Sequence, residues 1–303
     1  MQGTVDGFSY GLVTPVAAFL MACLGGALGL RCTTRSLRHQ ETFKAGWLAL
    51  GATAIGSGIW TMHFIAMMGF SVRQAPITYD RPITFASLAV AVVMVGIGIF
   101  IVGYKGATTL TLVTGGTITG LGVATMHYLG MAGMRLHGQI GYDSRTVALS
   151  VVIAVVAATA ALWAAVSVHG FLASLGASIV MGLAVSGMHY TAMAGVDVRL
   201  HGTPGTGAGD TATSLLLPML IGPGVFLLLA AVVVMFDPLL VMGEPDWQPP
   251  SARGGYRHGA PGVPAPRRGP AAHGEPANWS AGRPAARSGR RSAQRHAYRS
   301  QDW

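Results

Sequence analysis

The residues best suited to chemistry in this chain are three histidines that recur inside apolar segments. Each histidine follows a methionine and precedes an aromatic residue, and each has a second methionine four positions later and a glycine six positions later. Successive histidines are 64 and 62 residues apart, a period that predicts repeated supersecondary units. The histidines and their later methionines are His63 with Met67, His127 with Met131, and His189 with Met193.

This spacing places each histidine and its later methionine on one face of a helix, because four residues advance a helix by about one turn. A glycine seven residues before each histidine lies on the same face, where it lets a neighbouring backbone come close. We therefore expect the three faces to point into a shared interior. The methionines directly before the histidines lie about 100° away and are less able to reach the same centre. The glycines are Gly56, Gly120 and Gly182, and the preceding methionines are Met62, Met126 and Met188.

Imidazole nitrogen and thioether sulfur together form a ligand set that suits copper, especially Cu(I), better than Mg²⁺ or Ca²⁺. Three histidines alone can also hold zinc with an open position. Because the methionines repeat with the histidines, the sequence favours copper. A metal-free interpretation stays open at each position, since a histidine in a membrane helix can simply bond to a neighbouring helix and methionine commonly fills cores.

The elements that must position these residues are membrane-spanning helices. The chain of 303 residues is 51% hydrophobic and only 10% charged, whereas about 25% charged residues is typical of soluble domains. Seven apolar stretches reach the length of about 20 residues that a span requires. They are Tyr10–Leu30, Ala45–Phe70, Ile83–Gly103, Leu110–Met134, Thr146–Val168, Phe171–Val196 and Ser214–Phe236.

The predicted fold is an all-α membrane protein of seven transmembrane helices with three parallel internal repeats. The motif lies near the carboxyl end of the second, fourth and sixth spans, which run in the same direction. The third and fifth spans act as spacers, and the first and seventh flank the set. The first span is expected to be retained, because no basic residue precedes it and it is too long for the core of a signal peptide.

Loop charges predict the orientation. Four basic residues between the first two spans favour the cytoplasm for that loop, so the N-terminus is expected outside and the C-terminus inside a bacterial plasma membrane. The histidines then lie one to two turns below the outer surface, within reach of a small solute from outside. Nearby aromatic residues are expected to be interfacial. These aromatic residues are Trp60, Phe64, Tyr128 and Tyr190.

Residues 243–303 differ in composition from the membrane domain predicted at residues 1–242. They are rich in Gly, Pro, Ser, Ala and Arg, so we expect a disordered cytoplasmic tail whose arginines can touch anionic lipid. The net charge of +9 comes mostly from this tail and does not indicate a nucleic acid partner. Cys23 and Cys32 form no CxxC pair and predict no disulfide.

The repeated motif resembles the MHYT domain, and the resemblance covers about residues 6 to 242. It implies a bacterial inner-membrane sensor module that binds copper and senses a diatomic gas such as O₂, CO or NO. Such modules are often fused to cytoplasmic output domains for cyclic di-GMP or to histidine kinases. Carried over by motif, the implied copper ligands are His63, His127 and His189 with Met67, Met131 and Met193. The copies that carry the resemblance are Met126-His127-Tyr128 and Met188-His189-Tyr190, with the variant Met62-His63-Phe64.

The predicted function is that of a sensor in the lipid bilayer that binds copper and signals gas or redox state to a separate partner. We do not expect an enzyme, because the spans contain no acid–base pair, and no output domain is expected after the seventh span. Metal transport is the alternative, although the inner halves of the motif spans offer only small polar residues such as Ser57 and Thr119. A metal-free structural module is the third possibility.

Overall fold

The computed structural model describes residues 4–7, 9–38, 44–72, 75–168, 171–200 and 212–235. Within them, seven helices are long and apolar enough to cross a membrane, which confirms the predicted number and order of spans. The predicted copper site would therefore lie inside an all-α bundle. The helices are α1 Val13–Arg38, α2 Lys44–Met68, α3 Arg81–Lys105, α4 Thr109–Ala132, α5 Ser144–Ser167, α6 Phe171–Ala194 and α7 Ala212–Met235.

The first helix is longer than its predicted span, because it continues through the basic residues after Leu30. Contacts with other helices hold this extension. The Thr34 hydroxyl donates to the Ala165 carbonyl at 3.2 Å, and the Arg35 guanidinium lies 4.2 Å from the ring centroid of Trp47. Hydropathy alone ends the span where charges begin, whereas these tertiary contacts continue the helix.

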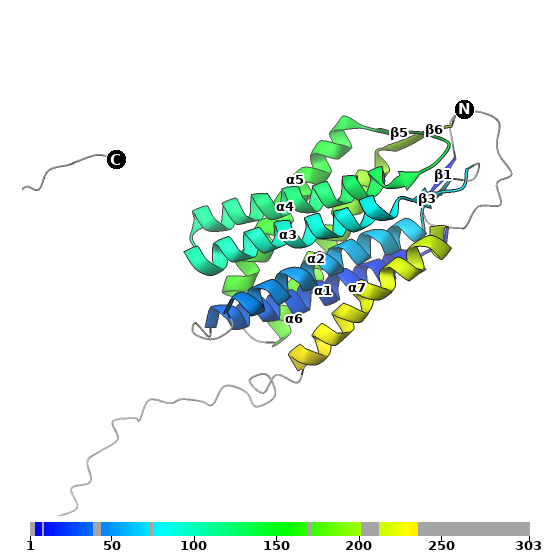
Figure 1. Ribbon diagram of the computed structural model, residues 1–303. Helices are drawn as coiled ribbons and strands as arrows, with labels where there is room; N and C mark the ends of the chain where they lie inside the picture. Colours follow the sequence, from blue (N-terminus) through cyan, green and yellow to red (C-terminus); the bar gives the residue numbers. More distant parts are fainter. Residues whose placement is uncertain are drawn as a thin grey trace, which may run out of the picture. The chain divides into compact units, whose positions relative to one another are not determined.

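Helices α1 to α6 form a closed ring in which each packs against the next and α6 packs back against α1. Helix α7 lies outside this ring against α2 and α1 (Figure 1). The odd helices α3 and α5 are therefore wall elements of the bundle rather than mere spacers. The expectation that the first helix only flanks the set is wrong, since α1 closes the ring between α6 and α2.

The glycines seven residues before the histidines explain how the ring is paired. A side chain added at any of them would collide with the neighbouring helix. At Gly56 and Gly120 it would meet the backbone of that helix, as predicted, whereas at Gly182 the nearest atom is the Cys23 sulfur. Helix α1 occupies, beside α6, the place that α3 occupies beside α2. The three contacts are Gly56 with Val92 of α3, Gly120 with Val155 of α5, and Gly182 with Cys23 of α1.

Short antiparallel strand pairs close the end of the bundle that carries the histidines. Each pair joins the segment before an odd helix to the segment after an even one. The longest pair aligns Ile140 with Val198. The pairs are β1 Val5–Asp6 with β2 Ser71–Val72, β3 Thr78–Tyr79 with β4 Met134–Arg135, and β5 Gly138–Tyr142 with β6 Val196–Leu200.

The glycines six residues after the histidines lie at the ends of the motif helices. The carbonyl oxygen of each accepts a hydrogen bond from the backbone N–H of a residue just before an odd helix, at 2.8 to 3.0 Å. The repeated glycine thus marks a junction between neighbouring helices as well as a helix end. The bonds run from Ser9 to Gly69, from Asp80 to Gly133, and from Asp143 to Gly195.

The predicted tail, residues 243–303, lies outside the described part of the chain, which ends at residue 235. The domain boundary at residue 242, the disorder of the tail and its contact with lipid therefore stay predictions. Cys23 and Cys32 are free thiols, as the sequence predicted.

Candidate metal centre

The three histidines come from three different helices and meet at one depth. Each lies five residues before the last residue of its helix, which places it about 7.5 Å from the helix end. Their exposed fractions are 1%, 1% and 2%. The structure therefore buries them one to two turns below the end of the bundle, at the depth that the sequence predicted.

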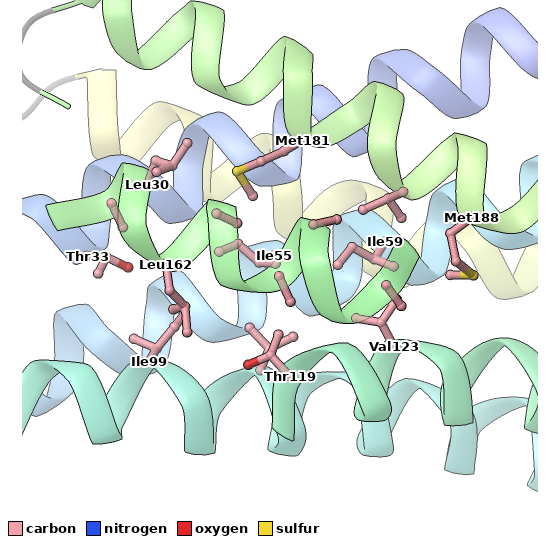
Figure 2. Close-up of a pocket in the computed structure, with 17 residues that line it drawn as sticks. Leu30, Thr33, Ile55, Ile59, Ile99, Thr119, Val123, Leu162, Met181 and Met188 are labelled. Atoms are coloured by element: carbon pink, nitrogen blue, oxygen red, sulfur yellow. The ribbon is translucent and has the colours of Figure 1, made fainter. Parts of the chain in front are cut away.

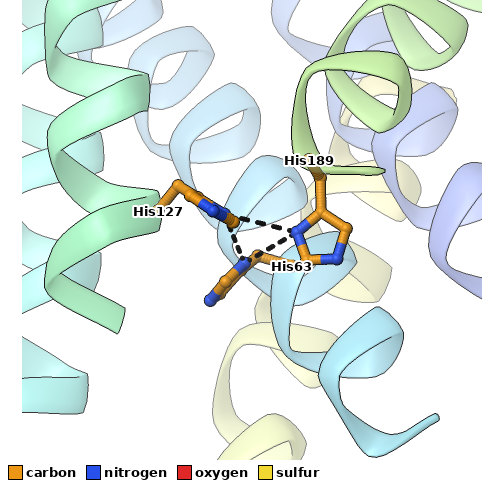
Figure 3. A group of neighbouring side chains, drawn as sticks. All are labelled: His63, His127 and His189. Carbon is orange, nitrogen blue, oxygen red and sulfur yellow. Dashed lines mark hydrogen bonds between the residues drawn. The ribbon is translucent and has the colours of Figure 1, made fainter. Parts of the chain in front are cut away.

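The three imidazoles turn their Nδ1 atoms toward one point (Figure 3). The Nδ1 of His63 lies 3.1 Å from that of His189 and 3.2 Å from that of His127. The third edge, between His189 and His127, is 3.3 Å. The ring planes are steeply inclined to one another, at 76° to 84°. A nearly equilateral triangle of nitrogens thus forms from residues that are far apart in the sequence.

Hydrogen bonding among neutral imidazoles cannot satisfy this triangle. Each Nδ1 carries either a proton or a lone pair, so with three rings at least two must be alike. Those two then present either two N–H groups or two lone pairs to each other at about 3 Å, which is repulsive. A cation that accepts all three lone pairs removes the conflict.

The nitrogen separations fit such a cation. Ligand nitrogens held at about 2.0–2.1 Å from one tetrahedral ion lie about 3.3 Å from one another. Among the described residues, the group of His, Cys, Asp and Glu side chains able to share a metal consists of these three histidines alone. A donor set of imidazole nitrogens suits copper or zinc rather than Mg²⁺ or Ca²⁺.

Two of the three outer ring nitrogens have no hydrogen bond. The Nε2 atoms of His63 and His127 are buried and have no hydrogen-bond partner. A Cβ added at Gly130 of α4 would lie 2.7 Å from the His63 Nε2. Gly130, three residues after His127, therefore makes the space that the His63 ring occupies.

The aromatic residue after each histidine lies edge-on against the imidazole. The ring centroids are 4.6 Å apart for His63 and Phe64, 4.9 Å for His127 and Tyr128, and 5.0 Å for His189 and Tyr190. These contacts restrict the orientation of the imidazoles. The motif thus supplies a histidine and a ring that packs against it.

The expectation that all four nearby aromatics are interfacial is wrong for Trp60 and Phe64, which are fully buried. The Trp60 indole N–H lies 3.0 Å from the Ser87 hydroxyl and 3.2 Å from the Thr84 carbonyl of α3. Helix α2 lies among α1, α3 and α7, so its aromatic residues have protein on every side.

The methionines divide into two layers. The later methionines lie one turn nearer the helix ends than the histidines, where Met67 and Met131 are buried and Met193 is half-buried. The preceding ones are buried as well, and Met188 lines an internal cavity. The structure brings the three histidines together, and a role for the thioether sulfurs stays a prediction.

In the described part of the chain, paired strands cover the triad at the nearer end of the bundle, where the three histidines are buried. Tyr79 and Met134, which are buried in the paired strands β3 and β4, cover Phe64 beside the triad. The Tyr79 hydroxyl lies 4.0 Å from the Met134 sulfur. The expectation that a small solute reaches the histidines directly from outside does not hold for the described residues, because the segments between the helices pair into strands over the site.

Sequence reasoning missed a cavity on the other side of the triad, inside the helical ring. Its volume is about 50 Å³, and its lining is almost entirely apolar (Figure 2). The signal in the sequence is an apolar residue four positions before each histidine, and all three of these residues line the cavity. They are Ile59, Val123 and Val185.

The sequence of this chain is similar to a known family and to several known signalling proteins. A family model for MHYT, described as a bacterial signalling protein N-terminal repeat, matches residues 56–115 and 120–178. These two ranges contain His63 and His127, and the third copy around His189 repeats the same geometry. No solved structure matches the chain significantly.

The similar proteins include large signalling enzymes. The chain is 37% identical over 197 residues to the bifunctional diguanylate cyclase/cyclic di-GMP phosphodiesterase MucR of Pseudomonas aeruginosa, covering 63% of this chain and 29% of MucR. It is 36% identical over 220 residues to the cyclic di-GMP phosphodiesterase NbdA of the same organism, covering 67% of this chain and 27% of NbdA. The signalling protein YkoW of Bacillus subtilis is 30% identical over 184 residues, covering 58% of this chain and 23% of YkoW. The chain thus spans less than a third of each of these relatives.

Proposed function

The chain belongs to the MHYT family of bacterial membrane signalling proteins, and on that premise we propose that it is a sensor whose signal is received at a copper centre. The ligands are the Nδ1 atoms of His63, His127 and His189. The observation that carries the proposal is the triangle of these atoms with edges of 3.1 to 3.3 Å. The repulsion among like nitrogens is the reason to expect a cation there.

The methionines complete the proposed centre. Met67, Met131 and Met193 lie one helical turn toward the bundle end, and a thioether from this layer favours Cu(I) over zinc. The three imidazoles would hold a copper ion and leave a coordination position at which a diatomic gas could bind. The three histidines hold and orient the centre, and the strand pairs exclude bulk water from it.

Changes at the centre have a direct path into the helix packing. Each ligand lies on a helix whose backbone touches the next helix at a glycine, so displacing a ligand moves a pair of helices. We propose that a cytoplasmic signalling protein or domain responds to this movement. Two similar proteins are named as enzymes of cyclic di-GMP metabolism, which makes that pathway the first to test.

Transport of an ion is less well supported than sensing. A pathway needs polar groups that replace the hydration shell of the ion along its length. The cavity beyond the triad offers two threonines, Thr33 and Thr119, among residues that are otherwise apolar. We likewise propose that this chain senses and does not itself catalyse a reaction.

The decisive experiment is metal analysis of tag-free protein purified from copper-replete cells, followed by absorption and paramagnetic resonance spectra. We expect about one copper per chain and spectra that change under CO, NO or O₂. Zinc at the same stoichiometry would show that the centre holds zinc, the alternative metal, and not copper. A protein free of metal under these conditions would contradict the sensor proposal and favour a structural module.

A further inference from the structure

The apolar cavity in the ring reaches the residue next to the histidine triad, although none of the three histidines lines it. Its lining includes Met188, which directly precedes His189, together with Ile59 and Val123 one turn before the other two histidines. Farther from the triad it is lined by residues eight positions before the histidines, among them Ile55 and Met181 (Figure 2). The cavity therefore approaches the inner side of the triad, opposite the strand pairs, and Met188 lies at that end of it.

The chemistry of the lining selects a small apolar occupant. A buried water usually makes about three hydrogen bonds, and the lining provides only the hydroxyl groups of Thr33 and Thr119. Apolar cavities of this kind stay dry and take up apolar guests such as xenon. The volume of about 50 Å³ exceeds the roughly 10–15 Å³ that one water requires by the same measure. Ions and polar solutes are excluded, whereas a molecule the size of a diatomic gas fits.

The pseudo-threefold packing shows where the ring is loosest. A Cβ added at Gly29 of α1 would lie 3.0 Å from the carbonyl oxygen of Gly51 in α2. A Cβ added at Gly98 of α3 would lie 2.7 Å from the carbonyl oxygen of Gly115 in α4. Of the three seams that join an odd helix to the even helix after it, two are therefore closed by facing glycines.

The third seam, between α5 and α6, lacks these glycines. Val155 is 63 residues after Val92, and His189 is 62 residues after His127. The residue 63 positions after Gly98 is Ala161 of α5, and the residue 62 positions after Gly115 is Ala177 of α6. Their methyl groups prevent the backbone approach that the glycines allow.

Exposure supports an opening at this seam. Four residues that line the cavity from α5 and α6 are half-buried. Val185 is one of them, whereas its counterparts Ile59 and Val123 are buried; Ile55 of α2, the counterpart of Met181, is half-buried as well. This seam faces the lipid, because both helices are membrane spans. The four half-buried residues are Ala157, Ala161, Met181 and Val185.

We propose that a diatomic gas dissolved in the lipid enters between α5 and α6, collects in this cavity and reaches the histidine centre from its inner side. The inference rests on the proposed function for the identity of the gas. Diatomic gases are apolar and dissolve in hydrocarbon, so a route through the bilayer suits them. The covered outer side of the triad makes such a route necessary.

Xenon tests the cavity without any metal. In metal-free protein with labelled methyl groups, xenon should shift the methyl resonances of Ile59, Val123 and Met181. These shifts should reach a plateau as the xenon concentration rises. The lipid-facing methyls of Val152 and Val156 should show only a linear, non-saturating response. Linear shifts at all five residues, or contacts from lipid chains to the cavity methyls, would contradict a gas cavity and assign the space to lipid.

Ala161→Leu tests the route, because a larger side chain at this seam fills the entrance. Ala160→Leu is the matched control, since it makes the same change on the exposed face of the same helix. We expect Ala161→Leu, and not the control, to weaken xenon binding and to slow NO association with copper-loaded protein several-fold at unchanged copper content. Equal association rates in the two variants would overturn the route.

The copper centre and the gas cavity can be tested separately. A wild-type protein that binds xenon with saturation but contains no copper would retain the cavity and overturn the proposed function. A copper protein that binds NO but shows no saturable xenon site would retain the function and overturn the cavity. If Ala161→Leu does not fold, the xenon measurement on the wild type still decides the cavity.

Discussion

At the residue scale, the triangle of imidazoles predicts that the ligands act as a unit. His127→Ala should abolish or strongly weaken copper binding, because two nitrogens cannot hold the ion as three do. Met131→Ala should weaken Cu(I) more than Cu(II), since thioether sulfur prefers the softer ion. Metal titration of the purified variants measures both effects.

Two control variants accompany that titration. Met126→Ala changes the methionine on a different helix face and should have a smaller effect than Met131→Ala. His137→Ala changes an exposed histidine of the connecting segment and should leave copper binding intact. Full copper loading in the His127 variant would contradict a shared centre.

Gly130→Ala should disturb the centre without removing any ligand. The added methyl would lie 2.7 Å from the His63 Nε2 and 3.2 Å from a ring carbon of Phe64, so the imidazole must move. We expect weaker copper binding and an altered copper spectrum. Gly176→Ala is the control, since its added methyl meets nothing within 4 Å. Identical spectra for the two variants would show that the position of the His63 ring is unimportant.

At the scale of the elements, the seams between helices depend on backbone contact. Gly120→Ala would place a methyl 2.7 Å from the Ala154 carbonyl oxygen of α5, and such overpacking typically costs about 1–3 kcal/mol. We therefore expect a lower thermal unfolding midpoint in detergent. Gly187→Ala lies in open space on α6 and should be neutral or stabilising. Equal midpoints for the two variants would contradict the tight seam.

The start of α3 should respond to pH through Asp80. The Ile83 backbone N–H donates to its carboxylate, and Arg135 of β4 pairs with it at 3.1 Å, so its pKa lies below the ordinary value. A lowered pKa means stabilisation that is present above the ordinary pKa of about 4 and is lost as the pH falls through the lowered value. Asp80→Asn should therefore be less stable than wild type at neutral pH and equal to it in acid.

Unfolding midpoints of the wild type and of Asp80→Asn between pH 3 and 7 measure this effect. Arg135→Gln provides a second probe, since it removes the partner and keeps the carboxylate. It should reduce the pH dependence without abolishing it, because the Ile83 bond remains. A constant difference between wild type and Asp80→Asn at every pH would contradict this interpretation.

At the scale of the whole molecule, the orientation decides which side receives the signal. The basic residues at the end of α1 and the start of α2 predict that the triad lies near the extracytoplasmic face. Reporter fusions after Arg38 and Met242 should read cytoplasmic, and one in the segment between α2 and α3 should read outside. The opposite pattern would place the triad near the cytoplasm and require a different path for the signal.

The sequence by itself determined the spans, the three copies of the motif, the identity of the histidines and their depth, because hydropathy and helical period are local properties. Only the tertiary structure decided that α1 rather than α7 stands beside α6, since that choice depends on which helix fits against Gly182. It also decided that three Nδ1 atoms converge, that strands cover them and that a cavity lies beneath them. These features arise where residues from distant parts of the chain pack together, and no pattern within one helix records the space that its neighbours leave.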